Sequence, residues 1–301
     1  MGVDGVFNPR LVMATTFGDH LADTYAQHFA GRRPEYAAYL RGGATLILQR
    51  ISNTTALYHD AEHTMMVTLV GQEIIRGRLL SEALKPEDWL HFIVALLVHD
   101  IGFVRGVCKG DGEDRVVINE AGETVHLPEG ASDAVLAPYH VDRGRLYVME
   151  RFAKSDIIDA ERIAQAVEFT RFPVPDGPPY NETDTERALV RASDLIGQLG
   201  DPFYLHKIKA LYHEFEETGA ARQLGYASPM DLERKYPEFF WTQVRPVIGK
   251  ALEHLDQTVE GKHWIAQLYN QVFKVDHQAL LQETPEEARA AAGRRAGPLS
   301  F

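Results

Sequence analysis

The chain has very little cysteine: Cys108 is the only one in 301 residues. A single thiol excludes a disulfide within the chain, and it excludes a zinc site built from several cysteines. No apolar run approaches the length of about 18 residues that a membrane-spanning helix needs. The first seven residues, Met-Gly-Val-Asp-Gly-Val-Phe, lack the apolar core of a signal peptide. We therefore expect a cytoplasmic protein without a membrane partner.

Positive charge is also scarce. Lys and Arg number 31 against 43 Asp and Glu, so the net charge is −12. This balance disfavours binding to a nucleic-acid backbone over a broad surface, because the phosphates would be repelled. A small anionic substrate is still compatible with it, because a bound dication dominates the field around itself. The sequence leaves open whether the chain is a monomer or a homodimer.

Most of the chain has apolar residues at helical spacing, and 45% of its residues are hydrophobic, which suffices for a sizeable core. We expect one catalytic domain over residues 1–282 and a flexible tail over residues 283–301. The pattern predicts helices over 16–30, 44–51 and 64–80, a helix that opens at Pro86, and a helix over 250–281. Two short β-type runs around Gly122 predict a hairpin insertion near residues 113–128. The predicted fold class is therefore all-α with a small β-hairpin.

Histidines and acidic residues gather between Leu57 and Gly102. His59 and His63 are four residues apart, so on a helix their side chains would share one face. The apolar run Phe92–Val98 predicts a buried helix that leads directly into His99 and Asp100. A histidine there can be an ordinary hydrogen-bonded core residue, but a buried carboxylate is costly unless it is paired or binds a metal. The pattern favours a metal site with nitrogen and oxygen ligands.

The arrangement of these residues resembles the HD superfamily of metal-dependent phosphohydrolases. The Tyr58-His59-x-x-x-His63 motif is most similar to the class I cyclic nucleotide phosphodiesterases, and the similarity extends faintly to residue 255. The resemblance implies an HD-domain or PDEase-like helical bundle with two divalent ions, Zn, Mn, Mg or Fe, in each site. It implies that His59 is the catalytic general acid. The metal ligands that it implies are His63, His99, Asp100, which would bridge both ions, and Asp194.

The chain also departs from the phosphodiesterase pattern. Phe239 is similar to the phenylalanine that clamps the purine in that family, but the purine-binding glutamine would then fall on Tyr236. Asp60 stands where the family has an asparagine. Asp60 and Phe239 are therefore candidates for substrate contacts, and the resemblance supports metal chemistry better than it supports specificity for cyclic nucleotides.

Two further histidines have alternative interpretations. His140 stands near a predicted helix start beside Arg143, and it can bind a second metal or contact a phosphate together with Arg143. It can equally belong to a hydrogen-bond network at the helix end. His126 lies on the predicted hairpin, where a histidine more often faces solvent than binds a metal.

These observations predict an enzyme that hydrolyses a small phosphoester, in the first place a phosphodiester such as a cyclic nucleotide. A nucleotide phosphomonoesterase is the alternative within the same class. A second class is an HD-type di-iron oxygenase, which would need two more histidine ligands, and His126 and His140 are the available pair. A third class is a non-catalytic ligand sensor, which an intact His59 beside a full ligand set disfavours.

Overall fold

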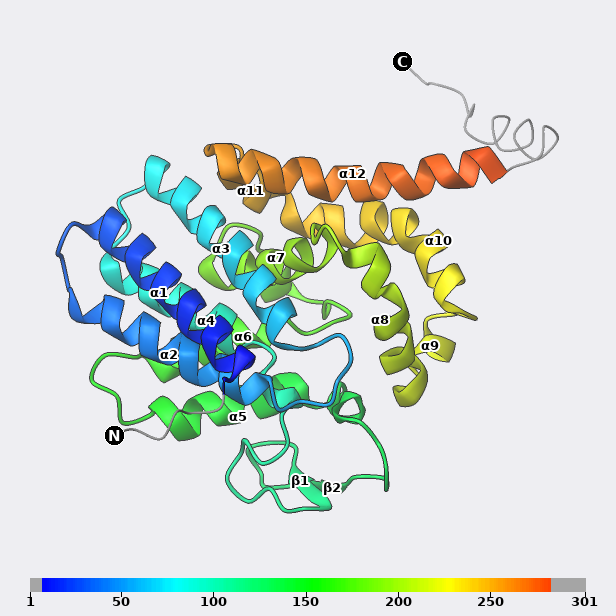
Figure 1. The fold of residues 1–301 in the computed structure, drawn as a ribbon, viewed down its shortest axis with the longest axis horizontal. Coiled ribbons are helices and arrows are strands. Elements are labelled where there is room, and N and C mark those ends of the chain that lie inside the picture. The colour runs from blue at the N-terminus through cyan, green and yellow to red at the C-terminus, as the bar shows by residue number, and fades with distance from the viewer. Residues whose placement is uncertain (1–6, 283–301) are drawn as a thin grey trace.

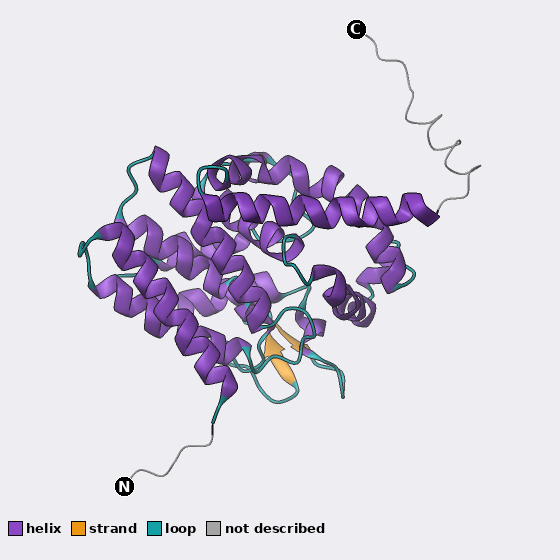
Figure 2. Ribbon diagram, turned by 45° about the horizontal axis from the view of Figure 1, so that its top comes forward, coloured by secondary structure: helices purple, strands orange, loops and turns teal. Residues whose placement is uncertain are grey.

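The computed structural model describes residues 7–282 as a helical body with one small hairpin at its edge (Figures 1 and 2). The predicted all-α class is confirmed. The first helices are α1 (Pro9–Phe29), α2 (Glu35–Ile51), α3 (Ala61–Ser81), α4 (Pro86–Val98), α5 (His140–Phe152) and α6 (Ala160–Glu168). They are followed by α7 (Glu186–Leu199), α8 (Tyr204–Thr218), α9 (Ala220–Gln223), α10 (Pro229–Phe239), α11 (Arg245–Leu255) and α12 (Val259–Gln282). Short 3-10 turns cover Ile101–Phe103, Asp133–Leu136 and Pro178–Asn181, and a π-helical stretch, Phe240–Val244, joins α10 to α11.

The core is organised around α4, in which every residue from Trp89 to Val98 is buried. α2 and α6 pack against α4, and α3 packs against both α4 and α7. α1 pairs with α2 on one side of the body, while α12 runs along its upper edge in Figure 1 and packs on α10. One buried apolar cluster includes residues of α1 and of α12. The apolar run that predicted a buried helix therefore forms the central element of the fold.

The helix boundaries follow local signals that the sequence carries. α4 opens at Pro86, and the side chain of Asp88 accepts a hydrogen bond from the N–H of Lys85 at 2.8 Å, as a first-turn carboxylate does at a helix start. α1 ends at Phe29, and the next two residues, Ala30 and Gly31, have the left-handed φ values of 44° and 83°. The predicted stop is confirmed, although α1 begins at Pro9, earlier than its apolar spacing predicted.

Two glycines, one near Asp194 and one near Asp100 in the sequence, allow neighbouring segments of the chain to approach closely. A Cβ at Gly197 of α7 would lie 2.6 Å from the Cα of Val67, so only glycine lets α7 approach α3 this closely. A Cβ at Gly102 would lie 1.9 Å from the carbonyl oxygen of His140. The turn after α4 therefore rests directly on the start of α5.

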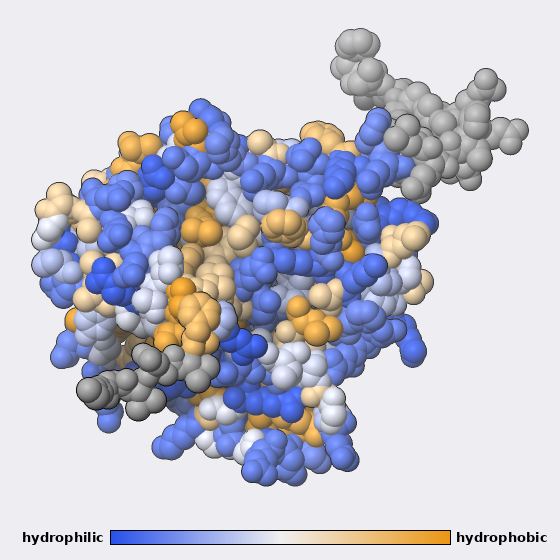
Figure 3. Space-filling model, viewed as in Figure 1, coloured by the Kyte–Doolittle hydropathy of each residue, from blue (hydrophilic) through white to orange (hydrophobic). Residues whose placement is uncertain are grey.

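The hairpin consists of β1 (Arg115–Val117) and β2 (Thr124–His126), antiparallel, with Val116 opposite Val125. It lies within the predicted insertion, and Gly122 has a φ of 76° in the connecting turn. Figure 3 shows hydrophilic residues over most of one face of the molecule, with smaller hydrophobic areas between them. Among residues 7–282, no helix combines the length and the apolar composition needed to cross a membrane. The predicted tail, 283–301, lies outside the described residues, and the single-domain boundary stays a prediction.

Candidate metal centre

Three helices bring four of the predicted ligands together in the interior. His63 lies in the first turn of α3, His99 and Asp100 follow the last residue of α4, and Asp194 lies on α7. Ligand atoms of His63, His99 and Asp194 all lie within 4.8 Å of one another. The Nε2 atoms of the two histidines are 3.4 Å apart, and that of His63 lies 3.3 Å from an oxygen of Asp194 and 3.3 Å from one of Asp100. These four side chains form what we call the cluster.

The cluster has the donor set and the orientation that a divalent cation requires. Nδ1 of His99 donates to the carbonyl of Leu96 at 2.7 Å, which leaves the lone pair of Nε2 directed at the cluster. Oδ2 of Asp100 is buried, with Nε2 of His99 3.1 Å away and Nε2 of His63 3.3 Å away, so it has a hydrogen-bond donor only while one of those nitrogens carries a proton. A buried carboxylate oxygen without a donor is costly unless a cation accompanies it. Two imidazole nitrogens with two carboxylates fit zinc, manganese or iron.

The carboxylates of the cluster favour positive charge on the neighbouring imidazoles. Burial disfavours the charged imidazoles, but the neighbouring carboxylates of Asp100 and Asp194 outweigh this and raise the pKa of His63 and of His99 to about 9. Burial likewise disfavours the charged form of Asp100, but His99 and His63 hold its pKa well below the usual range. Without a metal, protons supply the positive charge that the carboxylates need, and a cation would displace those protons.

His59 lies close to the cluster, but it is not on the helix where its spacing from His63 predicted it. α3 begins only at Ala61, with Asp60 as its cap, so His59 lies on the preceding loop and does not share a helix face with His63. The two rings are nevertheless close, with centroids 5.5 Å apart. The interpretation of a helical pair was wrong in its geometry, because an aspartate that accepts from the N–H of His63 starts the helix after His59.

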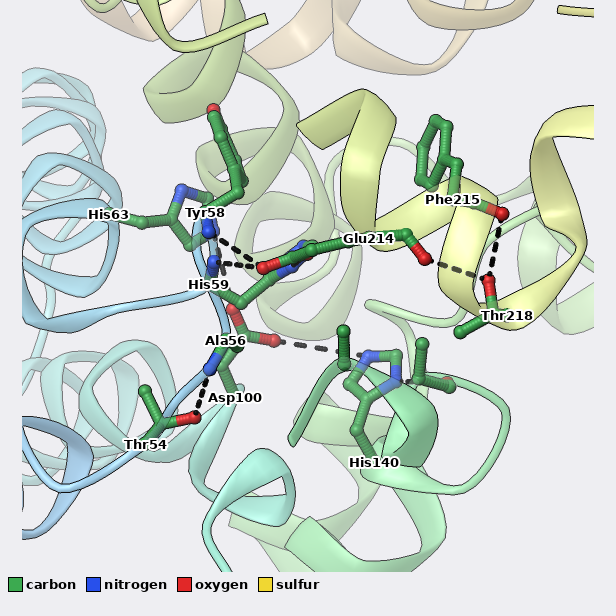
Figure 4. Close-up of polar contacts among 12 residues, drawn as sticks. Thr54, Ala56, Tyr58, His59, His63, Asp100, His140, Glu214, Phe215 and Thr218 are labelled. Atoms are coloured by element: carbon green, nitrogen blue, oxygen red, sulfur yellow. Dashed lines mark hydrogen bonds and ion pairs between the residues drawn. The ribbon is translucent and has the colours of Figure 1, made fainter. Parts of the chain in front are cut away.

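Glu214 of α8 holds His59 through three contacts (Figure 4). Its Oε2 lies 2.5 Å from Nδ1 of His59, and its Oε1 accepts from the backbone N–H groups of Tyr58 at 2.6 Å and of His59 at 3.3 Å. Burial lowers the pKa of His59, but the Glu214 carboxylate outweighs this and raises it above the ordinary value. Because Nδ1 is engaged by Glu214, Nε2 is the nitrogen of His59 that can exchange a proton with a ligand.

His140 makes the helix-end hydrogen bond that was one of its two expected roles, while its role as a metal or phosphate contact stays a prediction. At the start of α5 its Nδ1 donates to the carbonyl of Ala137 at 2.6 Å, which is the expected helix-end hydrogen bond. Its Nε2 faces Asp100, 3.9 Å from Oδ1 (Figure 4). Burial lowers the pKa of His140 and outweighs the opposite influence of Asp100. A neutral imidazole with its lone pair toward Asp100 could serve a second cation.

Arg143 and Asp60 have structural roles that the sequence did not indicate. Arg143 is fully buried, and its guanidinium donates to both oxygens of Asp111 at 3.0 Å and to the carbonyls of Gly102 and Val104 at 2.7 and 2.9 Å. It therefore has no donor to offer a phosphate, contrary to the expectation. Oδ1 of Asp60 accepts from the N–H of His63 as the cap of α3, and a substrate contact of Asp60 stays a prediction.

Three other residues stay outside the cluster. Phe239 packs edge-on against Phe172, with centroids 5.7 Å apart, and no contact among the described residues joins it to the four ligands. Tyr236, where the resemblance would place the purine-binding glutamine, is buried against Tyr204. His126 is exposed on β2, and its Nδ1 lies 2.8 Å from the carbonyl of Asp114. The interpretation of His126 as a solvent-facing hairpin residue agrees with this position.

Sequence reasoning missed two residues that contact the histidines. Glu214 carries a buried carboxylate whose partners, Tyr58 and His59, lie about 155 residues away in the sequence, so no local pattern identifies them. Phe103 stacks on His59 with centroids 4.6 Å apart and on His140 with centroids 4.5 Å apart. Its place, four residues after His99, was the only signal that it could reach the site.

A family model described as Npun_R2479-like matches residues 7–278. The chain therefore belongs to the Npun_R2479-like family. No curated protein matches the chain.

Proposed function

We propose that this member of the Npun_R2479-like family is a metal-dependent phosphohydrolase. The observation that carries the proposal is the position of His59, anchored by Glu214, beside a buried cluster of two imidazoles and two carboxylates. A proton carrier next to a cation site is the arrangement needed to displace an alkoxide from phosphorus. The HD-like order of the ligands in the sequence supports the same reading.

The four cluster residues, His63, His99, Asp100 and Asp194, would hold a Zn, Mn, Mg or Fe ion. A bound divalent cation would lower the pKa of a coordinated water from about 16 toward about 7 and would offset the charge of the phosphoryl oxygens. A second ion, if bound, would have Asp100 Oδ1 and His140 Nε2 as its available donors, which are 3.9 Å apart.

His59 would donate a proton from Nε2 to the oxygen of the leaving group. Glu214 keeps the imidazole oriented by its contact with Nδ1, and it stabilises the charged form that precedes the donation. Glu214 itself is only 3% exposed, so solvent does not weaken this pair as it would at the surface.

The substrate in this proposal is a small phosphodiester such as a cyclic nucleotide, with a nucleotide monoester as the alternative. The buried position of Tyr236 gives no support to purine recognition of the phosphodiesterase kind. The net charge of −12 disfavours a nucleic-acid backbone as a partner. The proposal includes a cytoplasmic location, to which the scarcity of cysteine is suited.

Oxygen activation by a di-iron pair is the second candidate, and the nearness of His140 to Asp100 is the observation in its favour. His126 would have to join as a further ligand, but it lies exposed on the hairpin with a backbone carbonyl as its partner. The hydrolase therefore agrees better with the available ligands.

A metal-depletion experiment tests the proposal. Chelator-treated protein is compared with protein restored by Zn, Mn or Mg on a panel of bis-p-nitrophenyl phosphate, cyclic nucleotides and mononucleotides. We expect hydrolysis that is lost on depletion and returns with the metal. Hydrolysis that is unaffected by thorough depletion, or no hydrolysis with any restored metal, would overturn the proposal.

A further inference from the structure

The ring of Phe103 lies between two imidazoles that come from distant parts of the chain. It is stacked on His59 with an interplanar angle of 13° and on His140 with an angle of 21°. The ring is 1% exposed and belongs to a small apolar cluster with Val116, Leu127 and Leu136. The ring is therefore packed among aliphatic side chains and also stacks with both histidines.

Phe103 is itself fixed relative to the metal ligands. It ends the 3-10 turn Ile101–Phe103, where its N–H donates to the carbonyl of Asp100 at 3.1 Å. The preceding Gly102 lets this turn rest against the His140 backbone, where a Cβ would collide. One short segment thus carries a cluster ligand and a ring that contacts both histidines.

Each imidazole has one short hydrogen bond apart from the stack, and the ring of His59 also meets those of Tyr58 and His63 edge-on. His59 has Glu214 at Nδ1, and His140 has the carbonyl of Ala137 at Nδ1. A single hydrogen bond at one nitrogen fixes the direction of that atom but not the plane of the ring. A stacked aromatic face restrains the plane, and a contact of this kind favours one orientation by about twofold to tenfold.

We propose that Phe103 is a positioning residue, which holds the ring planes of His59 and His140 in separate, fixed orientations toward the cluster. What the two histidines then do rests on the proposed function, but how they are held does not. The phenyl ring also keeps the two imidazoles apart, so that His59 stays available as a proton donor while His140 faces Asp100.

Substitutions at position 103 separate positioning from simple packing. Phe103→Tyr keeps both ring faces but adds a buried hydroxyl, whereas Phe103→Leu keeps an apolar side chain without faces. If the ring only fills space, leucine should be tolerated at least as well as tyrosine. If the ring positions the histidines, tyrosine should preserve the site better than leucine. Val116→Ala is the matched control, because it removes fully buried apolar volume from the same small cluster and leaves the Phe103 ring in place.

The first readout is nitrogen NMR of the histidine side chains, which needs no substrate. At a pH where both imidazoles are neutral, we expect His59 and His140 each to show one tautomer with hydrogen on Nδ1 in the original protein, in Phe103→Tyr and in Val116→Ala. In Phe103→Leu we expect averaged or doubled signals for both. Phe103→Met, which also lacks ring faces, replaces the leucine variant if that protein does not fold. Unchanged histidine signals in the folded leucine or methionine variant would overturn the proposal.

The second readout is the ratio of rates on an alkyl phosphodiester and on a p-nitrophenyl ester. Misplacing the proton donor should lower this ratio by about tenfold in Phe103→Leu and leave it unchanged in Phe103→Tyr and Val116→Ala. An equal loss in Val116→Ala would show a packing effect and contradict the proposal. If the original protein hydrolyses no phosphoester, the proposed function fails, and the NMR comparison alone decides the role of Phe103.

Discussion

Nδ1 of His59 and Oε2 of Glu214 lie 2.5 Å apart, although 155 residues separate them in the chain. The same carboxylate accepts from the N–H groups of Tyr58 and His59, so α8 fixes the loop that precedes α3. This contact determines which nitrogen of His59 is free.

Replacing Glu214 should disturb both the histidine and the loop. Glu214→Ala leaves two backbone N–H groups without their acceptor, and each unsatisfied buried group typically costs about 1–3 kcal/mol. Glu214→Gln retains an acceptor for the backbone but not the charge that stabilises the imidazolium. We expect Glu214→Gln to fold and to lose activity, and Glu214→Ala also to lose free energy of unfolding in denaturant titrations.

The matched control is Glu216→Gln on the same helix, where the side chain is exposed and, within residues 7–282, has an ion pair with His213 alone. This substitution should change neither the activity nor the free energy of unfolding. Full activity in Glu214→Gln would mean that His59 does not depend on its charged partner.

Metal binding should depend on the four cluster residues and not on the hairpin histidine. His99→Ala removes a buried ligand and leaves the ion open to water, so we expect the metal content after purification and dialysis to fall sharply. His126→Ala changes an exposed side chain outside the cluster and should keep the metal. Full metal occupancy of His99→Ala, measured by elemental analysis, would refute the ligand assignment.

The stabilisation of the fold by a bound metal ion should increase with pH. The pKa of His63 and of His99 is about 9 in the metal-free fold against an ordinary value of 6.5. A raised folded-state pKa contributes stability below about pH 6.5 that is lost as the pH rises through about 9. The metal-free protein should therefore lose stability over this interval. Metal binding, which displaces those protons, should strengthen by about tenfold per pH unit for each proton released.

Melting temperatures of the metal-free and metal-loaded protein, measured between pH 6.5 and 9, check this prediction. The difference between the two should widen as the pH rises. A constant difference would mean that neither imidazole loses a proton when the metal binds.

Hydrolysis and oxygenation differ in what they require. A phosphohydrolase should keep its activity without oxygen and with redox-inert Mg or Zn, since no electron is transferred. Assays under anaerobic conditions, with each metal supplied separately to depleted protein, measure this directly. A strict requirement for iron and oxygen would place the protein in the oxidative class.

The buried helix end with His99 and Asp100 could be predicted from local signals, whereas Asp194 was implied only by the resemblance to the HD superfamily. An apolar run that ends in His99-Asp100 describes a buried helix end, and that helix is the centre of the fold. His59 was expected on the helix of His63 because spacing alone does not reveal that Asp60 starts α3. The local signal was an aspartate able to cap, and it was read as a substrate contact.

Contacts between distant segments could not be predicted. The partners of Glu214 and of Phe103 depend on how α8 and the turn after α4 pack, and no local pattern encodes this. For Arg143, by contrast, the sequence suggested a contact that the structure does not support. An arginine near a candidate ligand suggested a phosphate contact, but the loop around Asp111 encloses it completely and uses its donors. Sequence gives the charge of a side chain but not its accessibility.

The most direct test of the account is the rate of His59→Ala on two phosphodiesters that differ in their leaving group. General acid catalysis is typically worth about 10²–10⁴-fold, and a poor leaving group depends on it most. We predict that the variant keeps its metal, loses rate on an alkyl phosphodiester by about this factor, and loses far less on a p-nitrophenyl ester. Equal losses on both substrates, or loss of the metal itself, would contradict the assignment of His59 as the general acid of a metal-dependent phosphohydrolase.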